Sequence, residues 1–235
     1  MSTVVELDGA RAIFSDRRGG VSEGPYESLN LGILTDDDPA KVTQNRRTLS
    51  AEHGLEAVAM GWQVHGVELR EWDEPPPERA FAEPGAELEK VDGHLTGRPG
   101  LALLVLVADC FPVALAGDGQ AAMLHCGWRG LAGGILERAL ARFERPPAAA
   151  VGPGIGRCCF EVGEEVLAEF AGYDAVAEGR MLDLRAVIAR KLAAAGVTRV
   201  EHADHCTSCR PELYFSHRRD GGVTGRQAGV VVLDG

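Results

Sequence analysis

The sequence predicts an α+β fold for this chain of 235 residues. Two observations lead to it. Residues 101–107 form an unbroken apolar run of strand length, LALLVLV, and a strand without a polar face must be covered on both sides. Strand-like stretches recur along the whole chain, but only three or four helices are expected among them, which is too few for a regular doubly wound sheet. We therefore expect a single α+β domain spanning residues 1–235.

Composition and charge limit the partners that the chain can have. Lys and Arg total 24 against 35 Asp and Glu, so the net charge is −11, which argues against nucleic acid and anionic membranes as partners. No apolar segment approaches the roughly 20 residues of a membrane span, and the N-terminus lacks the layout of a signal peptide. We expect a cytoplasmic protein, a monomer in preference to an oligomer, that acts on a small molecule. Its six cysteines should be reduced thiols or metal ligands.

The segment after the apolar run is the first candidate for a site. Pro112 has no N–H to donate in a central ladder, so we expect the backbone to bulge or turn there and to aim Cys110 out of the strand end. Residues 112–116 and 120–124 read as two strands around a tight turn at 117–119. This hairpin would bring His125 close to Cys110.

A helix is expected next, because apolar residues from Leu131 to Phe143 follow helical spacing. Arg129 stands at the start of this helix, where backbone donors and a guanidinium could together hold an anion.

The remaining elements follow from local signals. A strand pair is expected over 4–14 with a turn at Asp8-Gly9, and a helix over 40–53 opened by Pro39 and closed by Gly54. Asp183 should cap a helix that stops at Gly196. Further strands are expected near 64–70, 91–96, 148–152, 197–201 and 228–233, another helix over 164–170, a loop over 17–32 and an irregular connection over 71–90.

Two cysteine- or glycine-rich stretches suggest ligand binding, but weakly. Residues 152–160, GPGIGRCCF, resemble a phosphate-binding loop, yet no Gly-Lys-Ser/Thr follows, and a simple tight turn is favoured. Cys206 and Cys209 have the spacing of a zinc knuckle, with His202 and His205 just upstream. A structural knuckle usually needs two such pairs, and these four residues are crowded around one ion, so this site is disfavoured.

Arg218 and Arg219 lie in a basic loop, FSHRRD, that would suit an anionic or hydroxylated ligand.

Motifs along nearly the whole chain resemble the YfiH/DUF152 family, also called laccase-like multicopper polyphenol oxidases or peptidoglycan editing factors. They occur in the family's order and include RRGGVSEGPYESLNLG (17–32), QVHG (63–66), VDGHLT (91–96), ADCFPVAL (108–115), HCGWRG (125–130), GPGIGRCCFEVG (152–163), CTSC (206–209) and FSHRRD (215–220). One departure is Cys126, where the family usually has Ala. Another is Ile33-Leu34-Thr35, where relatives often carry a His-Val-Gly type of sequence.

The resemblance implies a layered αββα sandwich with the motif loops on one face. It also implies a catalytic metal site made of His65, Cys110 and His125. Two imidazoles and a thiolate suit Zn²⁺ or Cu²⁺, and three protein ligands leave a fourth position open for water or substrate. The same resemblance counts against the knuckle at His202 and His205, because the family does not use that segment as its metal site.

The activity implied by the resemblance is that of a zinc-dependent purine nucleoside enzyme. It would carry out phosphorolysis of adenosine, inosine and S-methyl-5′-thioadenosine, and deamination of adenosine. From charge and position, the candidates for binding phosphate are Arg46, Arg129, Arg218 and Arg219.

Three alternatives stay open. A metal-free hydrolase would use Cys110 as nucleophile and His125 as base, acting on a muropeptide amide. A copper-dependent oxidase of phenols is named by the older family label, although one three-ligand site lacks the several coppers that four-electron oxygen reduction needs. A metal-binding accessory protein without turnover is the least favoured, because an open three-ligand site beside Arg129 looks built for a substrate.

Overall fold

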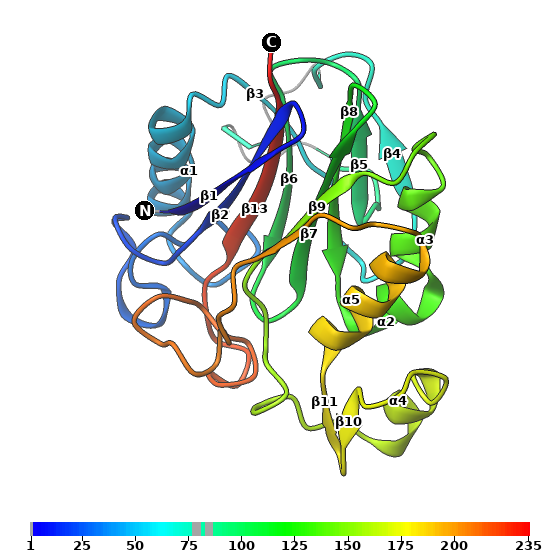
Figure 1. The fold of residues 1–235 in the computed structure, drawn as a ribbon. Coiled ribbons are helices and arrows are strands. Elements are labelled where there is room, and N and C mark those ends of the chain that lie inside the picture. Colours follow the sequence, from blue (N-terminus) through cyan, green and yellow to red (C-terminus); the bar gives the residue numbers. More distant parts are fainter. Residues whose placement is uncertain (1, 77–80, 83–86) are drawn as a thin grey trace.

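The computed structural model describes residues 2–76, 81–82 and 87–235, and its architecture is two β-sheets packed face to face between two layers of helix (Figure 1). The α+β fold and its αββα layering are thereby confirmed. The connection expected over 71–90 falls partly on residues 77–80 and 83–86, which lie outside the described residues.

The first sheet has five strands in the order β1-β2-β13-β6-β3. Their bounds are β1 Ser2–Leu7, β2 Ala10–Ser15, β13 Gln227–Leu233, β6 Leu101–Val107 and β3 Ala57–Ala59. β1 and β2 form the expected hairpin, and β13 lies antiparallel between β2 and β6. The C-terminal strand therefore lies in the middle of this sheet.

The second sheet has six strands in the order β12-β9-β7-β8-β5-β4. Their bounds are β12 Val200–His202, β9 Ala148–Val151, β7 Phe111–Gly117, β8 Gln120–Cys126, β5 Gly93–Thr96 and β4 Leu69–Glu71. β7 and β8 form the predicted hairpin, closed by Asp118 and Gly119, whose φ values of 52° and 73° are those of a type I′ turn. Phe111 pairs with Cys126 at its open end.

The helices cover the two outer faces. Helix α1, Pro39–His53, opens with Pro39 and ends at Gly54 in the left-handed conformation, as expected, and Asp38 caps its start. It lies beside the five-stranded sheet, whereas α2, α3 and α5 lie on the other side (Figure 1). The remaining elements are η1 Gly24–Tyr26, α2 Trp128–Gly133, α3 Ile135–Leu140, α4 Glu164–Glu169, β10 Ala177–Glu178, β11 Met181–Leu182 and α5 Leu184–Ala194, which Asp183 caps.

The apolar run that suggested a doubly covered strand behaves as expected. In β6, Leu103 and Val105 face the core between the two sheets, whereas Ala102 and Leu104 face the core beneath α1. The side of the second sheet that faces the first is built largely from small residues. They are Ala114, Ala116, Ala121, Ala148 and Ala150. Small side chains let the two sheets approach closely, and a third core lies between the second sheet and α2, α3 and α5.

Several predictions about elements were wrong in detail. The helix expected over 131–143 is broken at Gly134, where φ is 90°, into α2 and α3. The strand expected over 64–70 is reduced to β4, because the residues before it form a loop. Pro112 does not interrupt the ladder: it is the second residue of β7, and its carbonyl accepts the Gly152 N–H at 2.9 Å. The expected turn lies just before it, at residues 108–110.

None of the helices in the described part of the chain has the length and apolar character needed to cross a membrane.

Candidate metal and active site

Cys110 lies where the chain passes from one sheet to the other. β6 belongs to the first sheet and β7 to the second, and residues 108–110 form the link between them. In this link Asp109 has a φ of 91°. Its carboxylate accepts the Thr207 hydroxyl at 2.6 Å and the Arg218 N–H at 2.7 Å, so the link is held from a distant loop. The chain turn that aims Cys110 is therefore fixed by tertiary contacts as well as by the sheets.

His125 is held near the end of β8 by Asp92, which immediately precedes β5. The His125 N–H donates to the Asp92 carbonyl at 2.8 Å, and its ring Nδ1 lies 2.7 Å from Asp92 Oδ1. Both side chains are buried. A histidine whose Nδ1 is held by a carboxylate presents Nε2 in a fixed direction, which is the arrangement usual for metal-ligating histidines.

His65 is exposed and lies in a loop that is fastened to both sheets. Its own N–H donates to Asp92 Oδ1 at 2.9 Å, and the N–H groups of Val64 and Gly66 donate to Asp92 Oδ2 at 3.0 and 2.8 Å. Gln63 pairs with the backbone of Leu106 in β6 through both ends of its amide, each at 2.8 Å. These bonds hold His65 at a φ of 60°, a conformation uncommon outside glycine.

The three predicted ligands converge. One ligand atom each from His65, Cys110 and His125 lie within 4.8 Å of one another, and the two imidazole rings meet edge to face at 4.8 Å between centroids. Gly127 leaves the room for this approach: a Cβ there would lie 2.9 Å from Cys110 Sγ. Two imidazoles and a thiol gathered at this range match the donors of a zinc or copper ion.

The electrostatics of the site favour a Cys110 thiolate beside a protonated His125. Burial raises the pKa of the Cys110 thiol, but His125 and His65 lower it further than burial raises it, to about 6. Burial lowers the pKa of His125, but Cys110 and Asp92 raise it to about 9. Burial raises the pKa of Asp92, but hydrogen bonds from His125 and from the Gly66 and Val64 amides lower it to about 2. A thiolate, the form that binds metals, is thus accessible near neutral pH.

The three residues open onto a cavity of about 430 Å³. This volume lies in the range of small-molecule sites. Much of its wall is apolar, with Ile33, Leu34, Met60, Trp62, Leu106, Ile155 and Phe160 among the lining residues. Trp62 and Leu34 are 45% and 74% exposed, which is high for large apolar side chains.

The structure separates the four arginines proposed for phosphate binding. Arg218 lines the cavity, and its guanidinium donates to the Glu161 carbonyl at 2.8 Å. Arg46 also borders the cavity, but it is 1% exposed and donates to the carbonyls of Leu31 at 2.8 Å and Phe81 at 3.2 Å. These contacts indicate that Arg46 connects the loop at Leu31 to the core of the protein.

Arg129 and Arg219 are not among the residues that line this cavity. Arg129 is exposed at the start of α2, where its guanidinium stacks on the Trp128 ring at 4.3 Å. Arg219 forms an ion pair with Asp220 and donates to the Thr207 carbonyl at 3.0 Å.

Sequence reasoning missed two residues at the site. Asp92 was seen only as part of a strand motif, although it contacts two of the three predicted ligands. Arg226 also lines the cavity. Burial lowers the pKa of Arg226, and the charges of Asp109 and Cys110 partly oppose this effect. Asp92 lies in the motif VDGHLT (91–96) and Arg226 in the stretch TGRQ (224–227), but neither stretch reveals which distant residues these two side chains contact.

The structure does not bring together the residues of the disfavoured zinc knuckle, which were His202, His205, Cys206 and Cys209. Cys206 and Cys209 lie instead with Cys158 and Cys159, and one sulfur from each lies within 4.8 Å of the others. His205 Nδ1 lies 2.9 Å from the Tyr214 hydroxyl. Cys126 belongs to neither group in the described residues: it is buried in the core, where burial raises the pKa of its thiol.

The family model described as multi-copper polyphenol oxidoreductase laccase matches residues 11–234. The chain belongs to this laccase-like family. Members similar to it include a purine nucleoside phosphorylase of Streptomyces coelicolor, 38% identical over 97% of both chains. The purine nucleoside phosphorylase YfiH of Escherichia coli is 36% identical over 96% of this chain and 94% of its own length.

Solved structures of laccase-like family members have the same fold. YlmD from Geobacillus stearothermophilus superposes with a TM-score of 0.88 at 30% identity and covers 97% of this chain and 93% of its own. A DUF152 protein from Neisseria meningitidis gives a TM-score of 0.85 at 32% identity and covers 100% of this chain and 99% of its own. The motifs that suggested the family were therefore a correct guide to it.

Proposed function

We propose that this chain is a zinc-dependent purine nucleoside phosphorylase whose active site is the cavity at His65, Cys110 and His125. The observation that carries the proposal is the convergence of these three side chains on a cavity that Arg218 and Arg226 also line. The relatives named as purine nucleoside phosphorylases, at 36% and 38% identity, support the same reaction.

His65, Cys110 and His125 would hold the ion, and their donor set fits it. The lowered pKa of Cys110 favours its thiolate, which is the ligand form, and the contact with Asp92 fixes the ring of His125. Because the pKa of His125 is raised to about 9, binding of the ion would release a proton from this ring. A zinc ion bound there supplies a Lewis acid and lowers the pKa of a water molecule in its open position. The same donors would accept copper, because two histidines and one cysteine ligate copper as well as zinc in proteins.

Arg218 and Arg226 are the proposed phosphate ligands. Both line the cavity, and a guanidinium presents several donors in the geometry that phosphate accepts. Arg218 is fixed from behind by its bond to the Glu161 carbonyl and by stacking on the Phe160 ring at 5.2 Å. A phosphate ligand that is already oriented loses little side-chain entropy on binding.

The purine is expected against the apolar wall. Trp62 and Leu34, which are 45% and 74% exposed, line the cavity, and Phe160 adds an aromatic ring to its wall. A flat purine ring fits such a surface, because it can stack on aromatic side chains while its edge atoms remain hydrogen-bonded.

The reaction proposed is phosphorolysis of the glycosidic bond. An oxygen of hydrogen phosphate forms a bond to C1′ of the ribose, and the bond from C1′ to N9 of the purine breaks. The proton that hydrogen phosphate carried ends on the departing purine, so the products are ribose 1-phosphate and the free base. The chain's contribution is to hold the two reactants in line, which is a large part of such catalysis.

Inosine, adenosine and S-methyl-5′-thioadenosine are the proposed substrates, and deamination of adenosine is a proposed second activity. Deamination needs a hydroxide to attack C6 of the purine with release of ammonia, which an activated water could supply. A reduced Cys110 is required throughout, and we place the protein in the cytoplasm, where thiols are kept reduced.

The test is phosphate-dependent release of hypoxanthine from inosine by the purified protein. Turnover should disappear after metal stripping, return with zinc, and be absent in Cys110→Ala. Cys126→Ala is the matched control, because Cys126 lies next to His125 in sequence but outside the ligand group, and it should remain active. Failure of the zinc-loaded protein to release base from any of the three nucleosides would refute the proposal.

A second candidate, a cysteine hydrolase acting on a muropeptide amide, is favoured by one specific observation. Asp92, His125 and Cys110 form a chain in which the carboxylate holds the imidazole and the imidazole bonds the thiol. This is the arrangement of an activated cysteine nucleophile. Amide hydrolysis that survives a chelator and is lost on thiol alkylation would support it, and loss of hydrolysis with the metal would exclude it.

A further inference from the structure

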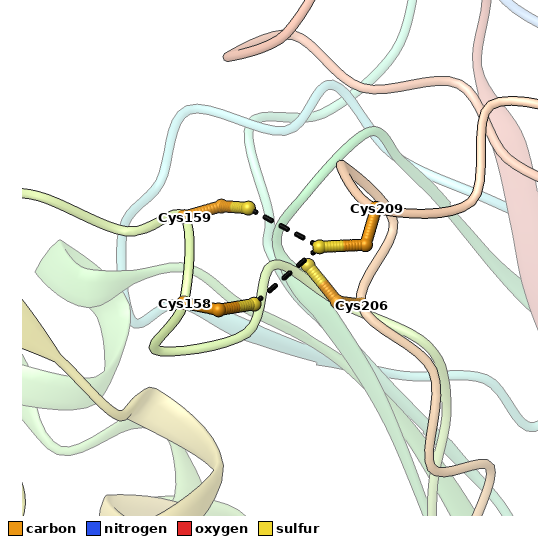
Figure 2. Close-up of side chains that lie close together, drawn as sticks. All are labelled: Cys158, Cys159, Cys206 and Cys209. Carbon is orange, nitrogen blue, oxygen red and sulfur yellow. Dashed lines mark hydrogen bonds between the residues drawn. The ribbon is translucent and has the colours of Figure 1, made fainter.

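Four cysteines meet beside the candidate active site but are not part of it. Cys158 and Cys159 come from the turn after β9, and Cys206 and Cys209 from the loop after β12. Figure 2 shows the two pairs facing each other across the gap between these segments. Cys209 Sγ lies 3.5 Å from Cys158 Sγ and 3.4 Å from Cys159 Sγ, and one sulfur from each of the four lies within 4.8 Å of the others.

This spacing fits one tetrahedral metal ion. With metal–sulfur bonds of about 2.3 Å, four thiolates around a zinc ion lie roughly 3.8 Å apart. An iron–sulfur cluster would place inorganic sulfide between the ligands and attach them to different iron atoms, so its cysteines would lie farther apart. The four sulfurs are closer together than a cluster would allow, and small rotations would give them the geometry of a single ion.

The backbone around the sulfurs is also arranged for thiolates. The Gly156 N–H donates to Cys206 Sγ at 3.2 Å. Gly156 is suited to this place because a Cβ there would lie 3.2 Å from Cys206 Cβ and 3.3 Å from Cys158 Sγ. Backbone N–H groups directed at sulfur stabilise the thiolate, as supporting contacts of metal ligands do.

The two segments are already in register. Gly154 and Cys206 form an isolated parallel bridge, and the Thr207 N–H donates to the Gly154 carbonyl at 3.0 Å. The same segments reach the cavity, because Ile155, Phe160 and Arg218 line it. Thr207 also bonds Asp109, the neighbour of Cys110. A link between residues 154–160 and 206–219 would therefore stabilise the part of the cavity wall that contains Arg218, the proposed phosphate ligand.

We propose that Cys158, Cys159, Cys206 and Cys209 bind one structural zinc ion, separate from the ion at His65, Cys110 and His125. The ion fastens residues 154–160 to residues 206–219. Four protein ligands fill its coordination, so it has no open position for substrate and its role is structural. Cys206 and Cys209 have the spacing of a zinc knuckle, and the adjacent Cys158 and Cys159 supply the other two ligands.

Metal content of the wild-type protein tests this without any substitution. After loading with zinc and removal of the excess, native mass spectrometry should show two zinc ions per chain. All six cysteines should react with an alkylating reagent after denaturation without reductant. Absence of any zinc ion from Cys110→Ala, iron in place of zinc, or fewer than six free thiols because of a disulfide would overturn the proposal.

Variants then assign each ion. Cys110→Ala and the double variant Cys206→Ser/Cys209→Ser should each retain one zinc ion, whereas Cys126→Ala should retain two. Cys158→Ser changes an exposed residue and serves where the double variant does not fold. Retention of two ions by a folded variant of the four cysteines would contradict the proposal.

Cobalt gives a readout that does not depend on activity. In Cys110→Ala, cobalt bound to four thiolates should show strong thiolate-to-metal absorption, which Cys158→Ser should weaken. Hydrogen exchange should become faster in residues 154–160 and 206–219 when this ion is removed. Loss of the ion without faster exchange in either segment would exclude the structural role. These measurements stand even if the protein does not turn over nucleosides.

Discussion

Asp92 Oδ1 lies 2.7 Å from Nδ1 of His125, and this carboxylate also accepts three consecutive N–H groups from residues 64–66. One buried side chain therefore orients the second histidine and positions the loop of the first. The three proposed ligands, His65, Cys110 and His125, are therefore held together, although they come from three separate parts of the chain.

Asp92→Asn should weaken zinc binding at the site by about 10-fold to 100-fold, because replacing a carboxylate that supports a ligating histidine has effects of this size. The amide also brings an NH₂ group against donors that now face an oxygen. Affinity is measured by competition with a chromophoric chelator. Asp118→Asn, at the far end of the β7–β8 hairpin, is the control and should leave affinity unchanged. Equal affinities in the two variants would contradict a supporting role for Asp92.

Gly127→Ala should lower turnover by about 100-fold, the order expected when reacting groups are displaced by a fraction of their spacing. Its φ of −83° suits alanine, so the effect would come from the methyl group, which would press on Cys110 Sγ and, at 3.2 Å, on His65 Cδ2. Gly172→Ala is a matched control, because a Cβ there meets nothing within 4 Å. Both variants are compared by kcat/KM and thermal unfolding. Full activity in Gly127→Ala would show that the ligands do not need this spacing.

Arg218→Ala should raise KM for phosphate by about 10-fold, because a charge-assisted hydrogen bond contributes about 1.5 to 3 kcal/mol and 1.4 kcal/mol corresponds to a factor of ten. Arg129→Ala should change it little, since Arg129 does not line the cavity. Steady-state kinetics with varied phosphate and saturating inosine separates the two. A larger effect in Arg129→Ala would restore the sequence-based assignment of phosphate to the start of α2.

Stability should fall in mild acid because of His94. This residue is fully buried, and its Nδ1 accepts the Trp72 indole N–H at 3.2 Å. Burial, and after it the charge of Arg70, lower its pKa from 6.5 to about 4, against the opposing charge of Asp92. As the pH falls below 6.5, the unfolded chain takes up a proton that the folded chain cannot. Between pH 7 and pH 5 this costs about 2 kcal/mol of unfolding free energy.

Urea unfolding at the two pH values checks the effect of His94. His94→Gln should lose less unfolding free energy between pH 7 and pH 5 than the wild type does, by about that 2 kcal/mol. A variant of the exposed His217, His217→Gln, should keep the wild-type pH dependence. If His94→Gln also keeps it, His94 is not the group responsible.

The local part of the site could be predicted from the sequence. The turn at Asp118-Gly119 dictates the β7–β8 hairpin, and the hairpin places His125 opposite Pro112, two residues from Cys110. Helix α1 could be predicted equally well, from Pro39 at its start and Gly54 at its end. In each case the information lies within a few residues and depends on backbone chemistry.

The partition of strands between sheets could not be predicted. β6 and β7 are both apolar on both faces because each sheet is covered on both sides, so periodicity does not reveal that they belong to different sheets. The pairing of Cys158 and Cys159 with Cys206 and Cys209 is hidden for the same reason: it depends on the parallel contact of β9 with β12, which no local signal encodes. The role of Asp92 depends on a loop 26 to 28 residues away.

The loop of His65 is fastened to β6 of one sheet through Gln63 and to the start of β5 of the other through Asp92. During folding, a chain with only the β7–β8 hairpin formed can present two of the three donors, and the third arrives when the sheets dock. We therefore expect the proposed ion to be captured late in folding. An ion bound only after the transition state slows unfolding and leaves the folding rate unchanged. The metal at this centre should thus determine how long the folded protein lasts, not how quickly it forms.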